Sequence, residues 1–198
     1  GFVKIVSESA ISAGVRRIEA VTGEAAEKLL YAAEDTIHAA AEVVGNPKLV
    51  DAVRRLVESN ESLSKELETI RKEQVAAMAD KIIAENGATE GVVVIARQIA
   101  RPTEFLKDLA YNLRARKSNL VLVLGSENGG KVTLMVMLGD AIVERGVDAG
   151  AVVREAAKLI NGGGGGQKFF ATAGGKNPDA LQAAIEKAVE IILAKINE

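Results

Sequence analysis

The sequence lacks cysteine and has a single histidine among its 198 residues. The missing cysteine excludes disulfide bonds, Cys-rich zinc sites and cysteine-based catalysis from this chain. The one histidine, His38, lies in an Ala-rich segment beside acidic residues, which is typical of a solvated helix face. A metal site on His38 would need carboxylates for its other ligands, and no Ser-His-Asp arrangement can be identified. We therefore expect no catalytic and no metal-binding residues in this chain.

Long apolar runs and aromatic residues are also scarce. No run approaches the roughly 18 apolar residues of a membrane span, and the N-terminus has no signal-peptide pattern, so we expect no membrane partner. Aromatic residues make up 3% of the chain, with no tryptophan. That is too few for an aromatic platform that reads single-stranded nucleic acid base by base. Recognition of nucleic-acid shape and backbone suits this composition better.

Two differently built regions are present. Hydrophobic residues make up 48% of the chain, which is enough for a buried core and excludes wholesale disorder. Residues 1–86 carry 11 basic and 15 acidic residues, a net charge of -4, whereas residues 87–198 carry 14 and 12, a net charge of +2. Of the 19 glycines, 15 follow position 86. We expect a remnant of another domain at 1–23, a helical part at 24–86 and a globular part at 87–198.

The first 23 residues resemble the edge of a domain rather than a domain of their own. Residues 2–6 and 15–21 are predicted to be strands on either side of Ser7-Glu8-Ser9-Ala10. Twenty-odd residues cannot bury a core. We therefore expect the rest of that domain to lie upstream.

Two stretches without glycine or proline predict helices. The first runs from Glu24 to Val44 and is ended by Gly45-Asn46-Pro47. The second runs from Lys48 to Asn86 and is ended by Gly87. As one helix this stretch would be about 58 Å long. A globule formed by residues 87–198 would have a radius of gyration of about 13 Å, so the helix would project well beyond it.

The second helix carries a heptad pattern. From Leu49 to Ile70, six apolar residues and one asparagine follow one another at intervals of 4, 3, 4, 3, 4 and 3 residues, which is the spacing of heptad a and d positions. Beyond Ile70 the apolar face shifts by one position, to Val75, Met78 and Ile82. Asn60 is a polar a residue of the kind that sets register in a two-stranded coil. The seam either packs on the preceding helix or pairs with a second chain, and its length favours a homodimer. The expected interface residues are Leu49, Val53, Leu56, Asn60, Leu63, Leu67 and Ile70.

The rest of the chain reads as α/β. Strands are predicted at 91–96, 119–124, 131–138 and 167–173, and helices at 102–116, 149–160 and 179–196. The expected fold class is α/β (α+β), in which a long helical hairpin or coiled coil precedes a globular mixed β-sheet domain with packed helices.

One stretch matches the phosphate-binding loop pattern G-x-x-x-x-G-K. It runs from Gly125 to Lys131. That loop also needs Ser or Thr next and then a helix, whereas Val132 and further strand formers follow here. We therefore interpret residues 126–130 as a β-hairpin turn.

Two glycine-rich segments remain. Gly162 to Gly166 follows a helix and precedes a strand, which does not fit a dinucleotide-binding turn, and we predict a structured loop rather than a flexible linker. Gly174-Gly175-Lys176-Asn177-Pro178 follows a strand and precedes a helix. Asn177 suits the N-cap, and free N–H groups beside Lys176 would suit a backbone phosphate, although ordinary capping explains the same residues.

Basic residues around these segments are the other candidates for nucleic-acid contact. Arg114, Arg116 and Lys117 fit either nucleic acid or the dipole at a helix C-terminus. The full set of candidates is Gly162, Gly163, Gly164, Gly165, Gly166, Gln167, Lys168, Lys176, Asn177, Arg97, Arg101, Arg114, Arg116, Lys117 and Lys131.

Two stretches carry a resemblance to a known family. Residues 1–23 (GFVKIVSESA ISAGVRRIEA VTG) are similar to the end of the editing domain of alanyl-tRNA synthetase. Residues 161–175, a glycine run followed by Ala-Thr-Ala-Gly-Gly, resemble the C-terminal domain of the same family and, more distantly, the substrate domain of DHH-type phosphoesterases. The stretches lie in the family's order, so the resemblance covers essentially the whole chain.

The resemblance implies a cytoplasmic, non-catalytic module of an alanine–tRNA ligase. Residues 24–86 would dimerise, and residues 87–198 would bind tRNA(Ala) at its outer corner, the elbow, to help aminoacylation and editing. ATP, magnesium and zinc would be used by the parent enzyme upstream, with no cofactor here. The chain departs from the pattern at Asn161, in the place of a glycine, and at Gln167, in the place of a basic residue or the phosphoesterase histidine.

Two alternatives follow from the same features. One is a phosphoesterase-like domain that binds a small phosphorylated molecule or nucleotide. Gln167 argues against it because an amide cannot act as an acid or base. The other is a purely structural dimerisation segment.

Overall fold

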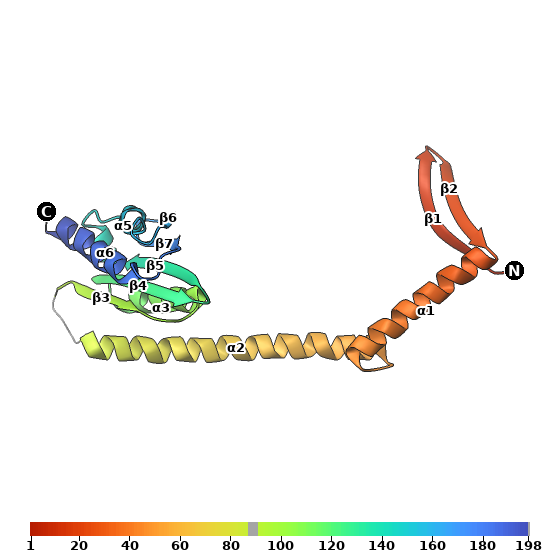
Figure 1. Ribbon diagram of the computed structural model, residues 1–198, viewed down its shortest axis with the longest axis horizontal. Helices are drawn as coiled ribbons and strands as arrows, with labels where there is room; N and C mark the ends of the chain where they lie inside the picture. The colour runs from red at the N-terminus through yellow and green to blue at the C-terminus, as the bar shows by residue number, and fades with distance from the viewer. Residues whose placement is uncertain (87–90, 198) are drawn as a thin grey trace. The chain divides into compact units, whose positions relative to one another are not determined.

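The computed structural model describes residues 1–86 and 91–197 (Figure 1). The chain forms two compact units, Gly1–Glu66 and Leu67–Glu198. The helix α2, Leu49–Asn86, contributes residues to both. The expected border between residues 86 and 87 adjoins residues 87–90, which lie outside the described residues.

The first unit begins with a β-hairpin. Strand β1, Val3–Ser12, pairs antiparallel with β2, Val15–Thr22. The predicted break at 7–10 is wrong, because these residues continue the strand and pair with β2 after a register shift. The chain turns instead at Gly14, whose φ of 77° favours glycine. No side chain of the hairpin is buried, as expected for a segment too short to form a core.

Two helices follow, with the bounds that the sequence predicts to within one residue. Helix α1 spans Glu24–Val44 and ends at Gly45 in the left-handed conformation, φ 68°. The N–H groups of Gly45 and Asn46 donate to Glu42 O and Ala41 O, which closes the helix end. The apolar residues of the two helices do not cover each other, since Leu29, Leu56 and Leu63 are all exposed. Packing of the seam on the preceding helix is therefore not observed.

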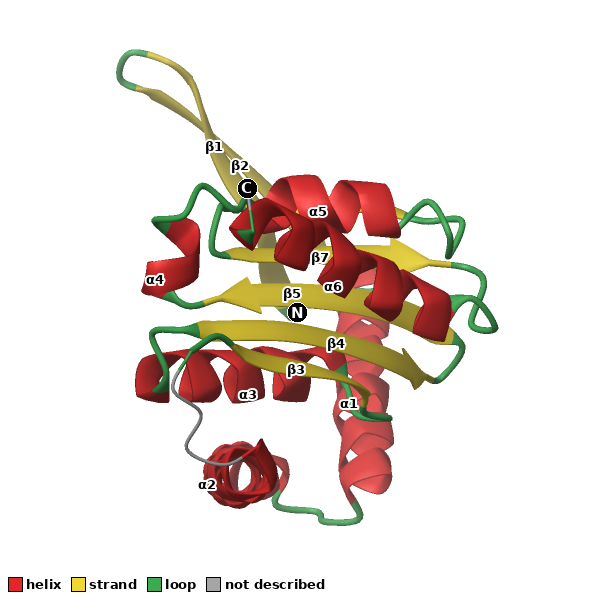
Figure 2. Cartoon of the chain, turned by 90° about the vertical axis from the view of Figure 1, so that its left-hand side faces the viewer, coloured by secondary structure: helices red, strands yellow, loops and turns green. Residues whose placement is uncertain are grey.

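The second unit contains a five-stranded mixed sheet, which confirms the expected fold class (Figure 2). The spatial order is β3-β4-β5-β7-β6, with β3 and β4 parallel and the other neighbours antiparallel. The strands are β3 Val93–Gln98, β4 Leu120–Asn128, β5 Lys131–Leu138, β6 Gly163–Gly166 and β7 Phe170–Gly175.

Helices cover both faces of this sheet. The residues Leu120 to Leu124 are fully buried, which explains why β4 is a continuous apolar run rather than an alternating one. Helices α5 and α6 pack on one face, and α3 packs on the other together with the end of α2 (Figure 2). The helices are α3 Thr103–Arg116, α4 Asp140–Val143, α5 Ala149–Ala156 and α6 Leu181–Ile196.

The slip in the apolar pattern of α2 has a structural counterpart. Val75, Ala79 and Ile82 are buried in the core cluster that α3 forms with the sheet. Leu67 and Ile70, before the slip, are 67% and 42% exposed. The slip therefore marks the point where the helix begins to pack on its own domain.

Candidate nucleic-acid interface

The glycine run is a strand, and the predicted loop is wrong. Residues 163–166 form β6 at the edge of the sheet and pair with β7. A Cβ built at Gly162, Gly164 or Gly166 would overlap a carbonyl oxygen of the β7 segment. Because side-chain positions in a strand alternate with period 2, every second residue of this segment has to be glycine.

At the alternate positions, Gly163 and Gly165, a side chain would not overlap the described part of the chain. No described atom lies within 4 Å of a Cβ built at Gly163. At Gly165 the nearest described atom is Arg154 Nη1, at an ordinary contact distance of 3.8 Å. Neither residue has a positive φ. Glycine at these positions leaves bare backbone on the surface, which permits close approach of another molecule.

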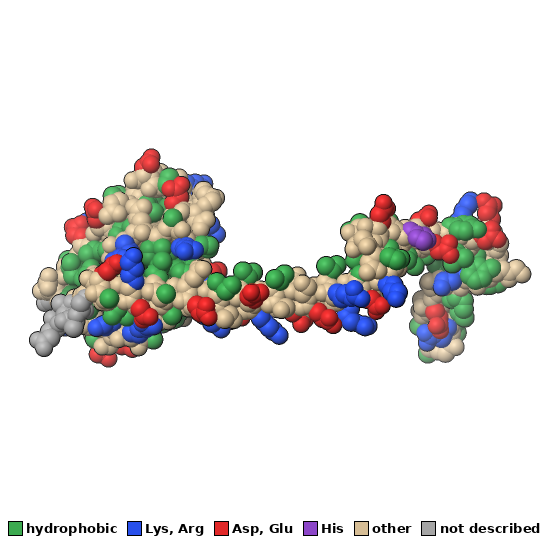
Figure 3. Space-filling model, turned by 90° about the horizontal axis from the view of Figure 1, so that it is seen from below, with side chains coloured by type: hydrophobic (Ala, Val, Ile, Leu, Met, Phe, Trp, Pro, Cys, Tyr) green, Lys and Arg blue, Asp and Glu red, His purple; other side chains and the backbone are tan. Residues whose placement is uncertain are grey.

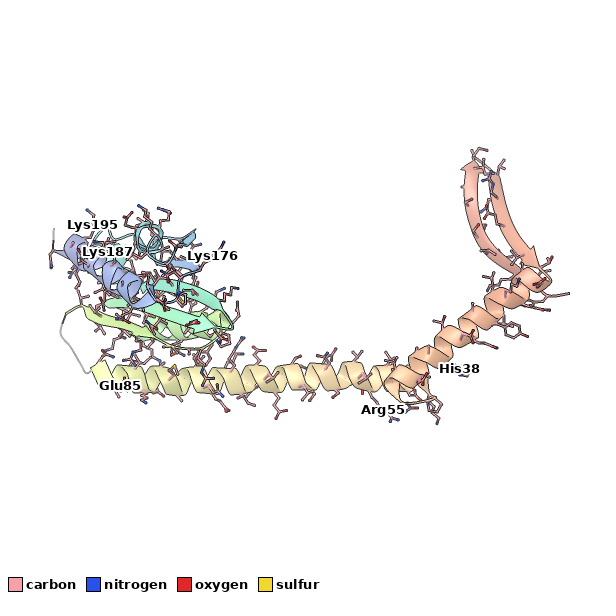
Figure 4. The ribbon with its side chains drawn as sticks, in the orientation of Figure 1. His38, Arg55, Glu85, Lys176, Lys187 and Lys195 are labelled. Atoms are coloured by element: carbon pink, nitrogen blue, oxygen red, sulfur yellow. The ribbon has the colours of Figure 1, made fainter. Side chains whose placement is uncertain are left out.

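The sheet topology places part of the candidate set together at one end. Val132 pairs with Gly175, and Gly174 pairs with Gly163. Lys131, Lys176 and the start of β6 therefore share this end, which we call the turn end because it also holds the β4–β5 turn. Figure 4 labels Lys176 beside the end of β7.

A groove opens at the turn end. Its volume is about 300 Å³, and the Thr103 and Thr133 hydroxyls meet in its wall at 3.3 Å. Ser126 Oγ donates to Arg101 O at 2.7 Å. The lining residues are Pro102, Thr103, Glu104, Ser126, Asn128, Lys131 and Thr133.

The segment that matches the phosphate-binding loop is a hairpin, as predicted. Asn128 pairs with Lys131, and β5 begins at Lys131 where such a loop would start its helix. Gly129 and Gly130 have φ of 59° and 76°, which fits a two-residue turn with both central residues left-handed.

The predicted helix cap at Asn177 is wrong, whereas the expected anion contact beside Lys176 stays a prediction. The N–H groups of Lys176 and Asn177 both donate to Ile160 O, at 2.9 and 3.1 Å. Helix α6 starts at Leu181, after Ala180, without a side-chain cap. The strand-glycine-helix order of the sequence is correct, but these two backbone donors are already used.

At the opposite end of the sheet, Arg114 serves the fold. Its Nε donates to Leu138 O at 3.0 Å, and its Nη2 to Asp140 Oδ1 at 2.5 Å. The guanidinium carbon lies 4.4 Å from the centre of the Phe169 ring. This cation is therefore engaged on three sides by its own chain.

Two further arginines are paired within the second unit. Arg116 Nη1 lies 2.5 Å from Asp80 Oδ1, and Arg97 Nη1 lies 3.1 Å from Glu85 Oε2. Exposed ion pairs of this kind contribute little to stability, but they reduce the positive charge available to a ligand.

Other candidate cations have no such partner. Within residues 1–86 and 91–197, the ammonium groups of Lys117, Lys131, Lys168 and Lys176 make no ion pair or hydrogen bond. The Arg101 guanidinium carbon lies 5.2 Å from the centre of the Phe105 ring.

Lys168 and Gln167 belong to the β6–β7 turn, at the end opposite Lys176. The N–H of Gln167 donates to Phe170 O at 2.8 Å. Sequence reasoning missed Arg154, an exposed residue of α5 that lies beside Gly165. Only its place one helix before the glycine run could have indicated it.

The expected dimer residues lie along α2, where apolar side chains are visible on its surface (Figure 3). Val53, Leu56 and Leu63 are 44%, 57% and 56% exposed. Asn60 accepts a hydrogen bond from Ser64 Oγ at 3.3 Å. Beside the seam, the Lys72 ammonium holds the pKa of Glu68 below its usual value through a hydrogen bond and its charge.

No helix among the described residues is long and apolar enough to cross a membrane. In the same part of the chain, no three His, Cys, Asp or Glu residues are grouped as metal ligands.

Comparison with known proteins gives consistent results. Residues 98–194 match the DHHA1 domain family. The chain is 46% identical over 193 residues to the alanine–tRNA ligase of Bacteroides thetaiotaomicron, covering 96% of this chain and 22% of that protein. It is 44% identical to that of Bacteroides fragilis, with the same coverage. The chain thus spans about a fifth of the length of these curated relatives.

Among solved structures, the C-Ala domain from the Aquifex aeolicus alanyl-tRNA synthetase is similar. The identity is 28% and the TM-score 0.46, and the match covers 56% of this chain and 97% of that one.

Proposed function

Since residues 98–194 belong to the DHHA1 domain family and nearly the whole chain is similar to part of bacterial alanine–tRNA ligases, we propose that it is a non-catalytic, tRNA-binding and dimerising module of such a ligase. The second unit would hold tRNA(Ala) at its elbow for aminoacylation and editing in the cytoplasm. ATP, magnesium and zinc would be bound by other parts of the enzyme.

The observation that carries the tRNA proposal is the bare backbone at Gly163. This residue does not need to be glycine for its own fold, and it lies at the same end of the sheet as Lys131 and Lys176, which have no ion-pair partner among the described residues. An RNA backbone is recognised by cations and by close backbone contact rather than by many aromatic rings. A phosphate ribbon lying across the turn end would use both features.

Charge reversal tests this surface. Lys131→Glu and Lys176→Glu should each weaken binding of tRNA(Ala) about tenfold. Each should also make the slope of log K against log salt concentration shallower, by the amount that corresponds to about one lost phosphate contact. Lys187→Glu is the control, because Lys187 pairs with Glu190 at 3.0 Å on α6 and lies outside the turn end. Fluorescence anisotropy with labelled tRNA at several salt concentrations measures both quantities.

Unchanged or salt-insensitive binding in both variants would contradict a phosphate surface at the turn end. If the unmodified chain has no measurable affinity for tRNA, the result would favour the alternative of a purely structural dimerisation segment. Nucleotide hydrolysis with magnesium or manganese would favour the phosphoesterase-like alternative.

The exposed seam of α2 supports the dimer proposal. A row of half-exposed leucines costs free energy in water, at about 25 cal/mol per Å² of apolar surface, and a second copy of the same row would cover it. Sedimentation of the chain at tens of micromolar should show a dimer.

A further inference from the structure

We propose that two copies of α2 pair in parallel and in register over Leu49–Ile70. This inference rests on the proposed dimer and adds its direction, which decides which residues of the two copies meet. In a parallel coil each a residue faces the same a residue of the second copy, whereas in an antiparallel coil a faces d.

Asn60 is the first indication of direction. In a parallel pair it meets Asn60 of the second copy, and the two amides can hydrogen-bond to each other. In an antiparallel pair it would face Leu56 or Leu63 of the second copy. The bond from Ser64 Oγ engages the Asn60 Oδ1, so against leucine the amide N–H groups of Asn60 would be buried without a partner from the described part of the chain.

The residues beside the seam are the second indication. In a parallel coil each g residue meets the e residue five positions later on the second copy. These pairs are Ala52 with Val57, Ser59 with Ser64 and Glu66 with Arg71. The first pair is apolar, the second pairs two hydroxyls and the third pairs opposite charges. In an antiparallel coil g meets g and e meets e, so Glu66 could not meet Arg71.

Arg71 already forms an ion pair with an acidic residue of its own chain. Its Nε lies 3.0 Å from Asp108 Oδ2 of the same unit, and the side chain is 43% exposed. The terminal guanidinium nitrogens remain for the carboxylate of Glu66 from the second copy.

The coil ends where the helix packs on its own domain. Val75 and Ile82 are buried in the second unit and cannot also face a second copy. The seam therefore has seven a and d layers, over about 32 Å of helix.

The absence of cysteine makes the direction directly testable. A single Ile70→Cys variant carries one thiol per chain. In a parallel coil the two thiols are adjacent and should form a disulfide in more than half of the chains under mild oxidation. In an antiparallel coil position 70 lies opposite position 53 or beyond. The two cysteines at position 70, one from each chain, are then about 25 Å apart, which is much farther than a disulfide can span.

Two further variants complete the experiment. Ser62→Cys, on the outer face of the helix, is the control and should give little covalent dimer. In a mixture of Val53→Cys and Ile70→Cys proteins, a predominantly mixed 53–70 crosslink would overturn the parallel direction. A reduced chain that sediments as a monomer would overturn the dimer itself, so the two failures are distinct.

The charge pair provides an independent measurement. Glu66→Lys should raise the dimer Kd about fivefold or more, because lysine would then face Arg71 of the second copy. Glu61→Lys makes the same charge change at an outer b position and should leave the Kd unchanged. Equal effects of the two variants would contradict the parallel pairing.

Discussion

The glycine run of β6 allows structure and binding to be tested with two alanine substitutions one residue apart. At Gly164 an added Cβ would overlap Thr172 O and would lie 2.6 Å from Ala173 Cβ. At Gly163 it would meet no described atom within 4 Å. Gly164→Ala should therefore disturb the β6–β7 pairing, whereas Gly163→Ala should leave it intact.

The two variants should change stability in opposite directions. Forcing a methyl group into a filled space costs about 1–3 kcal/mol, which lowers the Tm of a unit this size by roughly 3–10 °C. The loss for Gly164→Ala is limited to what β6 contributes, since an edge strand can detach alone. Gly163→Ala should raise stability by about 0.4–1 kcal/mol, because alanine restricts the unfolded chain. Thermal unfolding followed by circular dichroism measures both.

Binding should follow a different order. Gly163→Ala should weaken tRNA(Ala) about fivefold, roughly 1 kcal/mol, because its methyl group occupies the surface that the RNA approaches. A Gly163→Ala variant that unfolds as early as Gly164→Ala would refute the packing argument. One that folds normally and binds tRNA with unchanged affinity would refute the role of the bare backbone.

Further outcomes concern the seam and the opposite end of the sheet. The double variant Leu56→Lys, Leu63→Lys should convert the dimer to a monomer in sedimentation, because four like charges would enter the seam; a persistent dimer would show that the interface lies elsewhere. Arg114→Ala should lower the free energy of unfolding by about 1–3 kcal/mol in urea, because the Leu138 carbonyl loses its donor. Arg114→Lys should restore only part of that loss, and full restoration would contradict the forked contact with Leu138 O and Asp140.

Much of the fold could be predicted because local signals were strong. The glycine at position 45 adopts the left-handed conformation that ends α1, and the hairpin turn was expected within residues 126–130, although it is confined to Gly129-Gly130 because residues 126–128 continue β4. The slip of the apolar face after Ile70 was visible in the sequence, and the structure shows that residues after it reach the core of the second unit. These features depend on a few neighbouring residues, which a sequence shows directly.

The errors arose where distant residues decide the structure. Nothing in five consecutive glycines favours a strand, and β6 forms because β7 supplies hydrogen-bonding partners. Asn177 has the residue type of a cap, but Ile160 takes its N–H group. Likewise, the candidate cations Arg97, Arg114 and Arg116 are paired with residues far along the chain.

The slip in the apolar pattern of α2 has a consequence for which properties a substitution in this helix can change. In the proposed dimer, residues up to Ile70 would contribute to the free energy of association, whereas the residues from Val75 onward that are buried in the second unit contribute to its folding. Because Leu56 is exposed in the first unit and Ile82 is buried in the core of the second, the effects of substituting them should be additive. In the proposed dimer, substitutions in the seam would therefore change the strength of assembly without altering the packing of the α/β core.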